Sequence, residues 1–176
     1  MKKKISTIAF FLLVTFNAFS QDLDVKYKSK VSTLDTTIKT FYEVISGDKG
    51  EERNWELMRY LYHPKAKLVA TGKTKTGIYK ARYLTVEDYI DTSGKWLVEN
   101  GFFENEMYRK VETFGIITHV FSSYECFHTK SDTKPFMRGI NSIQLMNDGK
   151  RWWVMNVYFT QETPTNPIPK KYLKKA

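Results

Sequence analysis

The chain has 176 residues, of which 15% are aromatic, and a formal net charge of +9. Seven of the positive charges lie at its two ends, on Lys2, Lys3, Lys4, Lys170, Lys171, Lys174 and Lys175. The body between them is only weakly basic. We therefore expect no nucleic-acid partner, because such proteins usually carry a basic stripe interleaved with stacking aromatics. The single cysteine, Cys126, excludes an internal disulfide, so the fold depends on the burial of apolar side chains.

The first twenty residues have the pattern of a signal peptide. A basic start precedes an apolar stretch from Ile8 to Phe16, and the small residues Ala18 and Ser20 fit cleavage after Ser20. The apolar stretch is shorter than the roughly 20 residues that span a bilayer, and an uncleaved anchor is the alternative. We expect an exported protein, periplasmic or secreted, without a permanent membrane anchor. A flexible lead over residues 21–31 should follow the cleavage site.

A single domain is predicted over residues 32–162, and it begins with a helix. The helix starts near Ser32 or Thr33, Asp35 favours its positive N-terminal end, and Gly47 is a typical C-terminal cap. Its apolar stripe recurs every three or four residues and consists of Leu34, Ile38, Phe41 and Ile45. This stripe predicts that one face of the helix is buried.

The second helix is predicted from about Glu51 to His63-Pro64, because proline disfavours helical geometry in the residue before it. Two short extended segments follow, at residues 67–71 and 78–84. The segment TGKTKTG between them contains the end of a phosphate-binding loop motif. That motif needs glycine at the position that Lys67 occupies, so we interpret the segment as a solvated turn.

The third helix starts at Thr85, with Asp88 three residues later as in a capping box, and ends at Asn100-Gly101. Long strands are predicted after it, over residues 102–113, 116–129 and, as a hairpin, 136–161. Asn147-Asp148-Gly149 favours the hairpin turn, because Asp-Gly readily takes the positive φ angles that a tight turn requires. Three prolines then end the sheet and begin a Pro/Lys-rich tail over residues 163–176.

Apolar and polar residues alternate along the last two strands, so each strand should bury one of its faces. The faces of the penultimate strand carry Arg138, Ile140, Ser142 and Gln144 on one side, and Gly139, Asn141, Ile143 and Leu145 on the other. Those of the last strand carry Trp152, Val154, Asn156 and Tyr158 on one side, and Trp153, Met155, Val157 and Phe159 on the other. The sequence leaves open which sets line the interior.

The order of elements resembles that of the nuclear transport factor 2-like superfamily, and of its SnoaL-like members in particular. The resemblance covers about residues 34–162, with YHPKAKL after the second helix, RGINSIQL in the penultimate strand and RWWVMNVYFTQE at the end. It implies an α+β, cystatin-like cone with three N-terminal helices packed on a strongly curved, mostly antiparallel sheet. It also implies a cavity between helices and sheet, and a homodimer formed through the sheet.

Five polar residues are candidates for contacting a ligand in such a cavity: Tyr60, His63, Tyr124, Arg138 and Asn156. His63 lies near the cavity mouth that the resemblance implies, where it could act as an acid or base or simply cap the second helix. Arg138 could hold a carboxylate or phosphate by two hydrogen bonds, or form an ordinary cross-strand pair with Glu125. No metal or cofactor is indicated, because His63, His119 and His128 lack the spacing of paired ligands.

We therefore expect an exported protein that binds a small, partly apolar molecule, which those five polar side chains orient. A first alternative is a cofactor-independent lyase or isomerase that acts in the same cavity. The steroid isomerases of this superfamily use aspartates beside a tyrosine, whereas the aspartates here fall in turns or at the third helix. A second alternative is an interaction module that docks another protein on the curved sheet. The superfold hosts all of these activities, so the resemblance does not select one.

Overall fold

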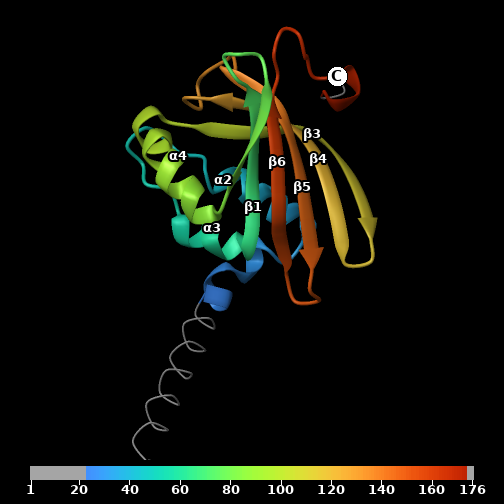
Figure 1. Cartoon of the computed structure of the whole chain (residues 1–176). Coiled ribbons are helices and arrows are strands. Elements are labelled where there is room, and N and C mark those ends of the chain that lie inside the picture. The colour runs from blue at the N-terminus through green and yellow to red at the C-terminus, as the bar shows by residue number, and fades with distance from the viewer. Residues whose placement is uncertain (1–22, 174–176) are drawn as a thin grey trace, which may run out of the picture.

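The computed structural model describes residues 23–173, and the signal peptide predicted for residues 1–20 lies outside them. A twisted, curved sheet carries the helices on one of its faces (Figure 1). This arrangement confirms the predicted α+β class. No helix within residues 23–173 combines the length and the apolarity needed to cross a membrane.

Three α-helices pack on the sheet, namely α2 (Leu34–Glu43), α3 (Trp55–Leu61) and α4 (Val86–Asn100). Thr33 caps α2 and Thr85 caps α4, each in a reciprocal capping box, so both predicted starts are confirmed. The predicted cap at Gly47 is wrong, because α2 ends earlier, with Val44 as its C-cap. Gly47 instead bridges to Phe102, and a side chain at position 47 would collide with Arg53.

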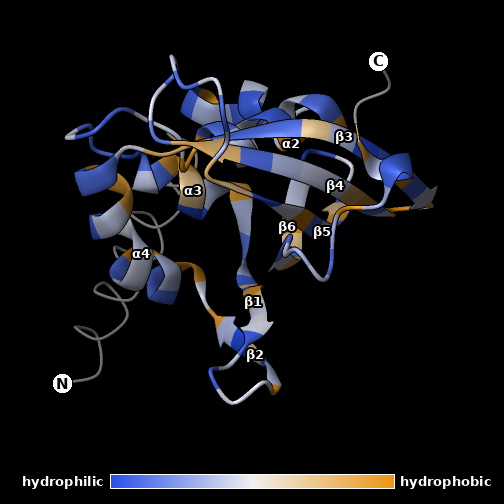
Figure 2. Ribbon diagram, turned by 90° about the horizontal axis from the view of Figure 1, so that it is seen from above, coloured by the Kyte–Doolittle hydropathy of each residue, from blue (hydrophilic) through white to orange (hydrophobic). Residues whose placement is uncertain are grey.

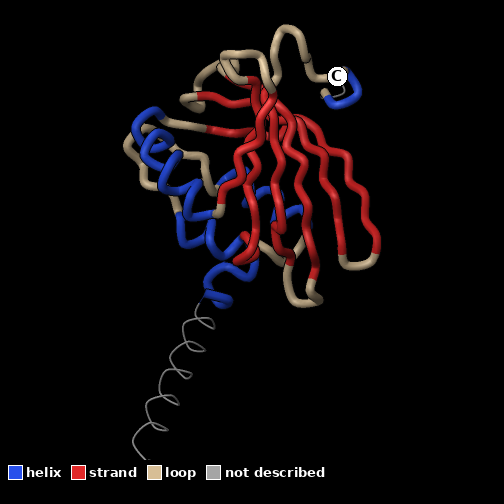
Figure 3. The backbone as a smooth tube through the Cα atoms, viewed as in Figure 1, coloured by secondary structure: helices blue, strands red, loops and turns tan. Residues whose placement is uncertain are grey.

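Six strands form one mixed sheet. They are β1 (Tyr62–Lys73), β2 (Tyr79–Leu84), β3 (Phe103–Phe114), β4 (Ile117–Phe127), β5 (Met137–Asn147) and β6 (Trp152–Gln161). The order across the sheet is β2-β1-β6-β5-β4-β3, and every neighbouring pair is antiparallel except β1 with β6. The long hairpins of β3 to β6 stand side by side (Figure 3). The predicted hairpin topology is therefore confirmed.

The strand β1 is longer than the segment predicted at residues 67–71, because it begins directly where α3 ends. Pro64 stops the helix as expected, yet it does not prevent a strand. Pairing of β1 with β2 begins only at Leu68, so the missing backbone donor of Pro64 disturbs no bond on that side.

A β-bulge in β6 decides which of its side chains face the helices. Leu145 of β5 pairs with Val154, whereas Gln144 pairs with Asn156, so Met155 is an extra residue on β6. Side-chain alternation changes faces at such a bulge. The inner set therefore mixes the two predicted groups and consists of Trp152, Val154, Val157 and Phe159.

Residues 23–31, most of the segment expected to be a flexible lead, are packed against the body. Residues 23–27 are helical and the 3-10 helix η1 (Lys28–Lys30) follows. The Tyr27 hydroxyl donates a hydrogen bond to Glu56 at 2.7 Å, and Val31 is fully buried. This segment thus belongs to the folded domain, because its apolar side chains complete the core beside α3.

Part of the C-terminal tail also contacts the body. Ile168 is buried, and the 3-10 helix η2 (Lys170–Tyr172) brings Tyr172 to the outer face of β4. The ring of Tyr172 lies 5.0 Å from that of Phe121, between centroids, and the Ser123 hydroxyl donates to the Tyr172 carbonyl. The outer face of the sheet is therefore partly covered by the chain's own end.

Candidate ligand-binding cavity

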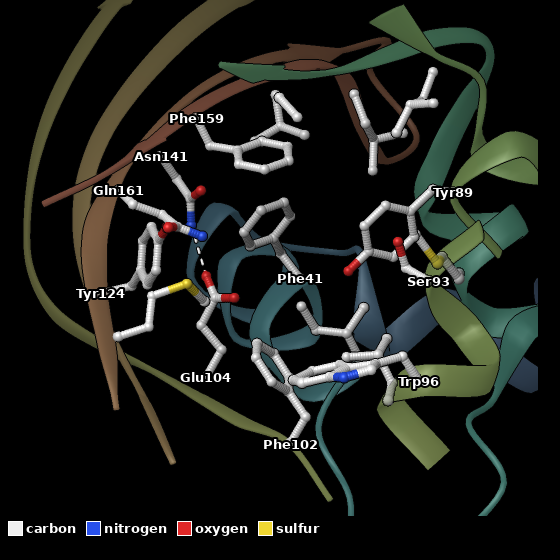
Figure 4. Close-up of a pocket in the computed structure, with 18 of the residues that line it drawn as sticks. Phe41, Tyr89, Ser93, Trp96, Phe102, Glu104, Tyr124, Asn141, Phe159 and Gln161 are labelled. Carbon is white, nitrogen blue, oxygen red and sulfur yellow. Dashed lines mark hydrogen bonds between the residues drawn. The ribbon is translucent and has the colours of Figure 1, made fainter. Parts of the chain in front are cut away.

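A cavity of about 260 Å³ lies between the inner face of the sheet and the three helices. Side chains from α2, α3 and α4 line one side of it, and side chains from β1 to β6 line the other. The lining is mostly apolar and aromatic, and Figure 4 shows the rings of Phe41, Tyr89, Trp96, Phe102 and Phe159 around the void. Such a surface favours a partly apolar guest, which would leave water on entering.

Glu104 of β3 is an acidic, half-buried residue in this mostly apolar lining. Asn141 of β5 is buried, and its side-chain amide donates a hydrogen bond to Oε1 of Glu104 at 2.8 Å. Figure 4 shows this bond and the carboxylate facing the cavity. No other side chain of residues 23–173 donates to the carboxylate.

Burial raises the pKa of the Glu104 carboxyl from 4.5 to about 7, and the hydrogen bond from Asn141 opposes this rise. Removing a carboxylate from water disfavours its charged form, whereas a donated hydrogen bond favours that form. Near neutral pH both protonation states are therefore populated. The carboxyl can then donate or accept a proton at the wall of the cavity.

A chain of buried hydrogen bonds holds Asn141 in place. Its amide lies 3.4 Å from the hydroxyl of Tyr42, which is 2.7 Å from the hydroxyl of Ser122. Ser122 donates in turn to Glu106 at 2.7 Å. Because Tyr42 lies on α2 and Ser122 on β4, these bonds tie the helix to the sheet behind Glu104. They fix the direction in which the Asn141 amide points.

Two phenols face the same void. Tyr89 of α4 points its hydroxyl into the cavity, and Tyr124 of β4 lines it close to Glu104 (Figure 4). Burial, with a smaller contribution from Glu104, raises the pKa of both phenols, so both stay protonated. Neither hydroxyl has a hydrogen-bond partner in the part of the chain that the structure describes. A guest could therefore satisfy them.

The position of Tyr124 depends on Gly139, its neighbour across β4 and β5. A side chain at position 139 would collide with the Tyr124 hydroxyl and with the carbonyl of Thr160. Gly139 has no positive φ, so it is the close approach of the ring, and not backbone conformation, that requires glycine here.

Of the five residues predicted to contact a ligand, the structure places Tyr124 in the lining of the cavity and the other four outside it. Arg138 lies on the outer side of β5. Glu125 of β4 is the register partner of Arg138, as expected for neighbouring strands. The ion pair of Arg138, however, is with Glu162, at 2.7 Å. Asn156 is turned outward by the bulge and bonds to Gln144 at 3.2 Å.

Tyr60 and His63 belong to a second aromatic cluster around Trp153, where Tyr60 lines a separate, more open cavity of about 890 Å³. The guanidinium of Arg151 lies between the rings of Tyr60 and Trp153, 3.8 and 3.7 Å from their centroids. His63 packs edge-on against Trp153, and its Nδ1 accepts a hydrogen bond from the backbone of Lys65. The five predicted residues are thus not brought together.

Sequence reasoning did not select Glu104 or Asn141. For Asn141 a signal existed, because Ile143 and Leu145 share its face and are more apolar than Ser142 and Gln144 on the other. For Glu104 the signal was weak, since an acidic residue on a strand usually faces solvent. Its place follows from the register of β3 and β4, in which Glu104 pairs with the buried Cys126, so both side chains lie on the inner face.

Comparison with known proteins supports the fold. No protein-family model matches the sequence, and no curated protein matches it. An NTF2-like protein of unknown function from Silicibacter pomeroyi is 13% identical, with a TM-score of 0.52 over 74% of this chain and 94% of that chain. An NTF2-like protein from Cytophaga hutchinsonii is 12% identical, with a TM-score of 0.52 over 72% of this chain and 93% of that chain.

A protein of unknown function with a cystatin-like fold, from Nostoc punctiforme, is also similar. It is 9% identical, with a TM-score of 0.51 over 76% of this chain and 90% of that chain. Identities this low support a shared fold and no shared activity. The chain therefore has the NTF2-like, cystatin-like cone fold that its sequence predicts.

Proposed function

We propose that the protein binds a small, largely apolar molecule in the cone cavity, with Glu104 and Asn141 as its polar anchors. The observation that carries this proposal is a half-satisfied carboxyl that faces an aromatic-lined void. A buried polar group without its full set of hydrogen bonds costs free energy, so a guest that supplies the missing bond gains affinity. The phenols of Tyr89 and Tyr124 offer two further hydrogen bonds.

The volume limits the guest. A cavity of about 260 Å³ is slightly smaller than the ~300–1,000 Å³ of most ligand pockets, so it suits a compact molecule of one or two rings. The guest needs one polar group toward Glu104 and an apolar body toward Phe41 and Phe102.

A second candidate function is proton transfer on such a guest, as in a cofactor-independent lyase or isomerase. The observation that favours it is the pKa of Glu104, which burial raises to about 7. A general acid or base works best when its pKa lies near the working pH. The neutral phenols would hold the oxygen of a reacting carbonyl. Binding comes first in either case, so a single site serves both functions.

Binding can be tested with 2-naphthol as the probe and naphthalene as its apolar match. We expect 2-naphthol to bind more tightly, by about tenfold, because its hydroxyl bonds to Glu104. In Glu104→Gln this preference should shrink. The matched control is Glu125→Gln, on the outer side of β4, which should behave as the wild type. Equal binding of both probes to the wild type, or equal losses in both variants, would contradict the proposal.

The export and the homodimer remain predictions. The predicted signal peptide lies outside the described residues, and N-terminal sequencing of protein from its own host tests whether the chain is cleaved after Ser20. A homodimer formed through the outer face of the sheet would have to accommodate Tyr172 on Phe121. Light scattering of the purified protein measures the oligomeric state directly.

A further inference from the structure

The β1–β2 hairpin carries the most one-sided charge of the molecule. Residues 62–84 contain no aspartate or glutamate, and they contain six cationic side chains, Lys65, Lys67, Lys73, Lys75, Lys80 and Arg82. All six are exposed. None of them forms an ion pair with another residue of 23–173. The weakly basic average of the body therefore conceals a strongly basic hairpin.

Protection of a sheet edge explains part of this charge but not its sign. The strand β2 is one edge of the sheet, and charged side chains on an edge prevent pairing with other chains. The other edge, β3, achieves this with charges of both signs, which pair with one another as Lys110 with Glu112 and Arg109 with Glu106. Only Lys80 and Arg82 lie on β2 itself, so protection of this edge does not account for Lys65, Lys67, Lys73 and Lys75.

The hairpin also presents apolar side chains among its lysines. Ile78 is 60% exposed, Tyr79 is 74% exposed and Tyr83 is 70% exposed. Figure 2 shows that the hairpin projects away from the body of the protein. Exposed aliphatic and aromatic side chains at a projecting tip, flanked by Lys73, Lys75 and Lys80, form a surface that is both cationic and apolar.

We propose that this hairpin docks the protein, reversibly, on the surface of an anionic phospholipid bilayer. Lysines near such a surface are attracted by its negative potential, and tyrosine prefers the headgroup region. Ile78 would gain by entering the boundary between headgroups and acyl chains. Five of the six cations are lysines, whose point charges suit a diffuse anionic surface, whereas the reading of base edges in nucleic acids favours the planar guanidinium of arginine.

The docked orientation would bring the cavity to the membrane. Arg82 and Leu84 of β2 line the cavity, so the hairpin and the cavity share a wall. A partly apolar guest concentrates in a bilayer, and a cavity held at that surface would meet it there. Docking does not depend on the proposed ligand, however, and can be tested without one.

The experiment is co-sedimentation of the purified chain with phosphatidylcholine vesicles, with or without phosphatidylglycerol, at low and high salt. We expect binding only to the vesicles that contain phosphatidylglycerol, and weaker binding at high salt. In Lys73→Gln/Lys75→Gln/Lys80→Gln the affinity should fall by at least about tenfold. Ile78→Ser should weaken the binding that remains at high salt.

The matched control is Lys49→Gln/Lys134→Gln/Lys150→Gln, which removes three exposed lysines outside the hairpin. All variants keep the same chain ends, so the N-terminal segment contributes equally to each. Absent binding to phosphatidylglycerol vesicles, or an equal loss in the control, would overturn the proposal. So would binding of a single-stranded oligonucleotide, but not of vesicles, with the same dependence on the three hairpin lysines. Binding of 2-naphthol is measured separately, so failure of docking leaves the cavity proposal intact.

Discussion

Two clusters of aromatic residues in this protein each hold a charged side chain, and they differ in how many stacking and hydrogen-bond partners that charge has. In the outer cluster, Arg151 is 7% exposed and lies between the rings of Tyr60 and Trp153. Its guanidinium donates to the carbonyls of Tyr60 and Trp152. In the cone, Glu104 receives a hydrogen bond from a single side chain of residues 23–173 and faces a cavity. Both groups border a cavity, of about 890 Å³ beside Arg151 and about 260 Å³ beside Glu104, but Arg151 is stacked between two rings and bonded to two carbonyls.

This difference separates a structural cluster from a candidate site. Both clusters contain tyrosines and a charged group, so composition alone would rank them equally. A charge that is stacked between aromatic rings and hydrogen-bonded contributes to stability. A charge that is poorly solvated and has too few hydrogen-bond partners lowers the stability of the fold. Folded proteins retain such groups mostly where they act on a ligand. The comparison therefore predicts opposite effects when the two charges are removed.

Removal of Arg151 should have the largest effect on stability. Arg151→Ala leaves two rings without the group between them and leaves the Tyr60 carbonyl without its side-chain donor. We expect the free energy of unfolding to fall by about 2–4 kcal/mol. Denaturant unfolding measures this, with the exposed neighbour Lys150→Ala as the control. A loss no larger than that of the control would mean that the outer cluster is not structural.

The next effect concerns the fit of Tyr124 in the cone. Gly139→Ala should lower the free energy of unfolding by about 1–3 kcal/mol, because the new methyl group collides with Tyr124 and with the backbone of Thr160. Gly72→Ala is the control, since nothing lies close to a side chain at that position of β1. Unfolding curves that respond equally to both changes would contradict the packing described for Tyr124.

Removal of the Glu104 charge should stabilise the protein instead. The folded-state pKa of Glu104 is raised from 4.5 to about 7, so its neutral form is favoured on folding. That contribution is fully present below about pH 4.5 and is lost as the pH rises through about 7. Glu104→Gln stays neutral, and above this window it should be more stable than the wild type by about 1–2 kcal/mol.

The gain in Glu104→Gln should vanish in acid, where the wild-type carboxyl is also neutral. Thermal unfolding across this pH range, beside Glu125→Gln, distinguishes the effect from a general change in surface charge. A Glu104→Gln protein that is less stable at every pH would show that the carboxylate is satisfied in the fold.

The smallest effect is on the titration of Glu104 itself. Asn141 donates a hydrogen bond to the carboxylate, which lowers the pKa of Glu104 against the larger effect of burial. Asn141→Leu should therefore raise that pKa further, by roughly one unit. Side-chain carboxyl NMR follows the titration, with Asn156→Leu on the outer face as the control. A pKa that falls or stays constant in Asn141→Leu would exclude Asn141 as the residue that sets it.

Much of the fold follows from local sequence signals. The capping boxes at Thr33 and Thr85 and the hairpin turn at Gly149 depend on neighbouring residues, and they lie where the sequence predicts them. The helix cap predicted at Gly47 is wrong because this glycine has a tertiary role: it makes room for Arg53 and bridges to Phe102. A local pattern cannot distinguish such a glycine from a helix cap.

The candidate site was harder to predict, because it depends on how strands combine. The bulge at Met155 turns Asn156 outward, and no residue type near it marks the change of face. Glu104 and Asn141 lie on strands that are not neighbours, with β4 between them. They meet across β4 on the inner face of the sheet, and that arrangement depends on the whole fold. Tyr124, one of the five predicted ligand contacts, lines the cavity, but no pattern in the sequence distinguished it from the other four.

The account depends on Glu104 being a poorly solvated carboxyl that meets the guest. The most direct test is its side-chain NMR titration, with and without 2-naphthol. We predict a midpoint near pH 7 in the free protein, and a midpoint that moves when the probe is bound. A titration midpoint of Glu104 near pH 4.5 that does not change when 2-naphthol is bound would contradict the account.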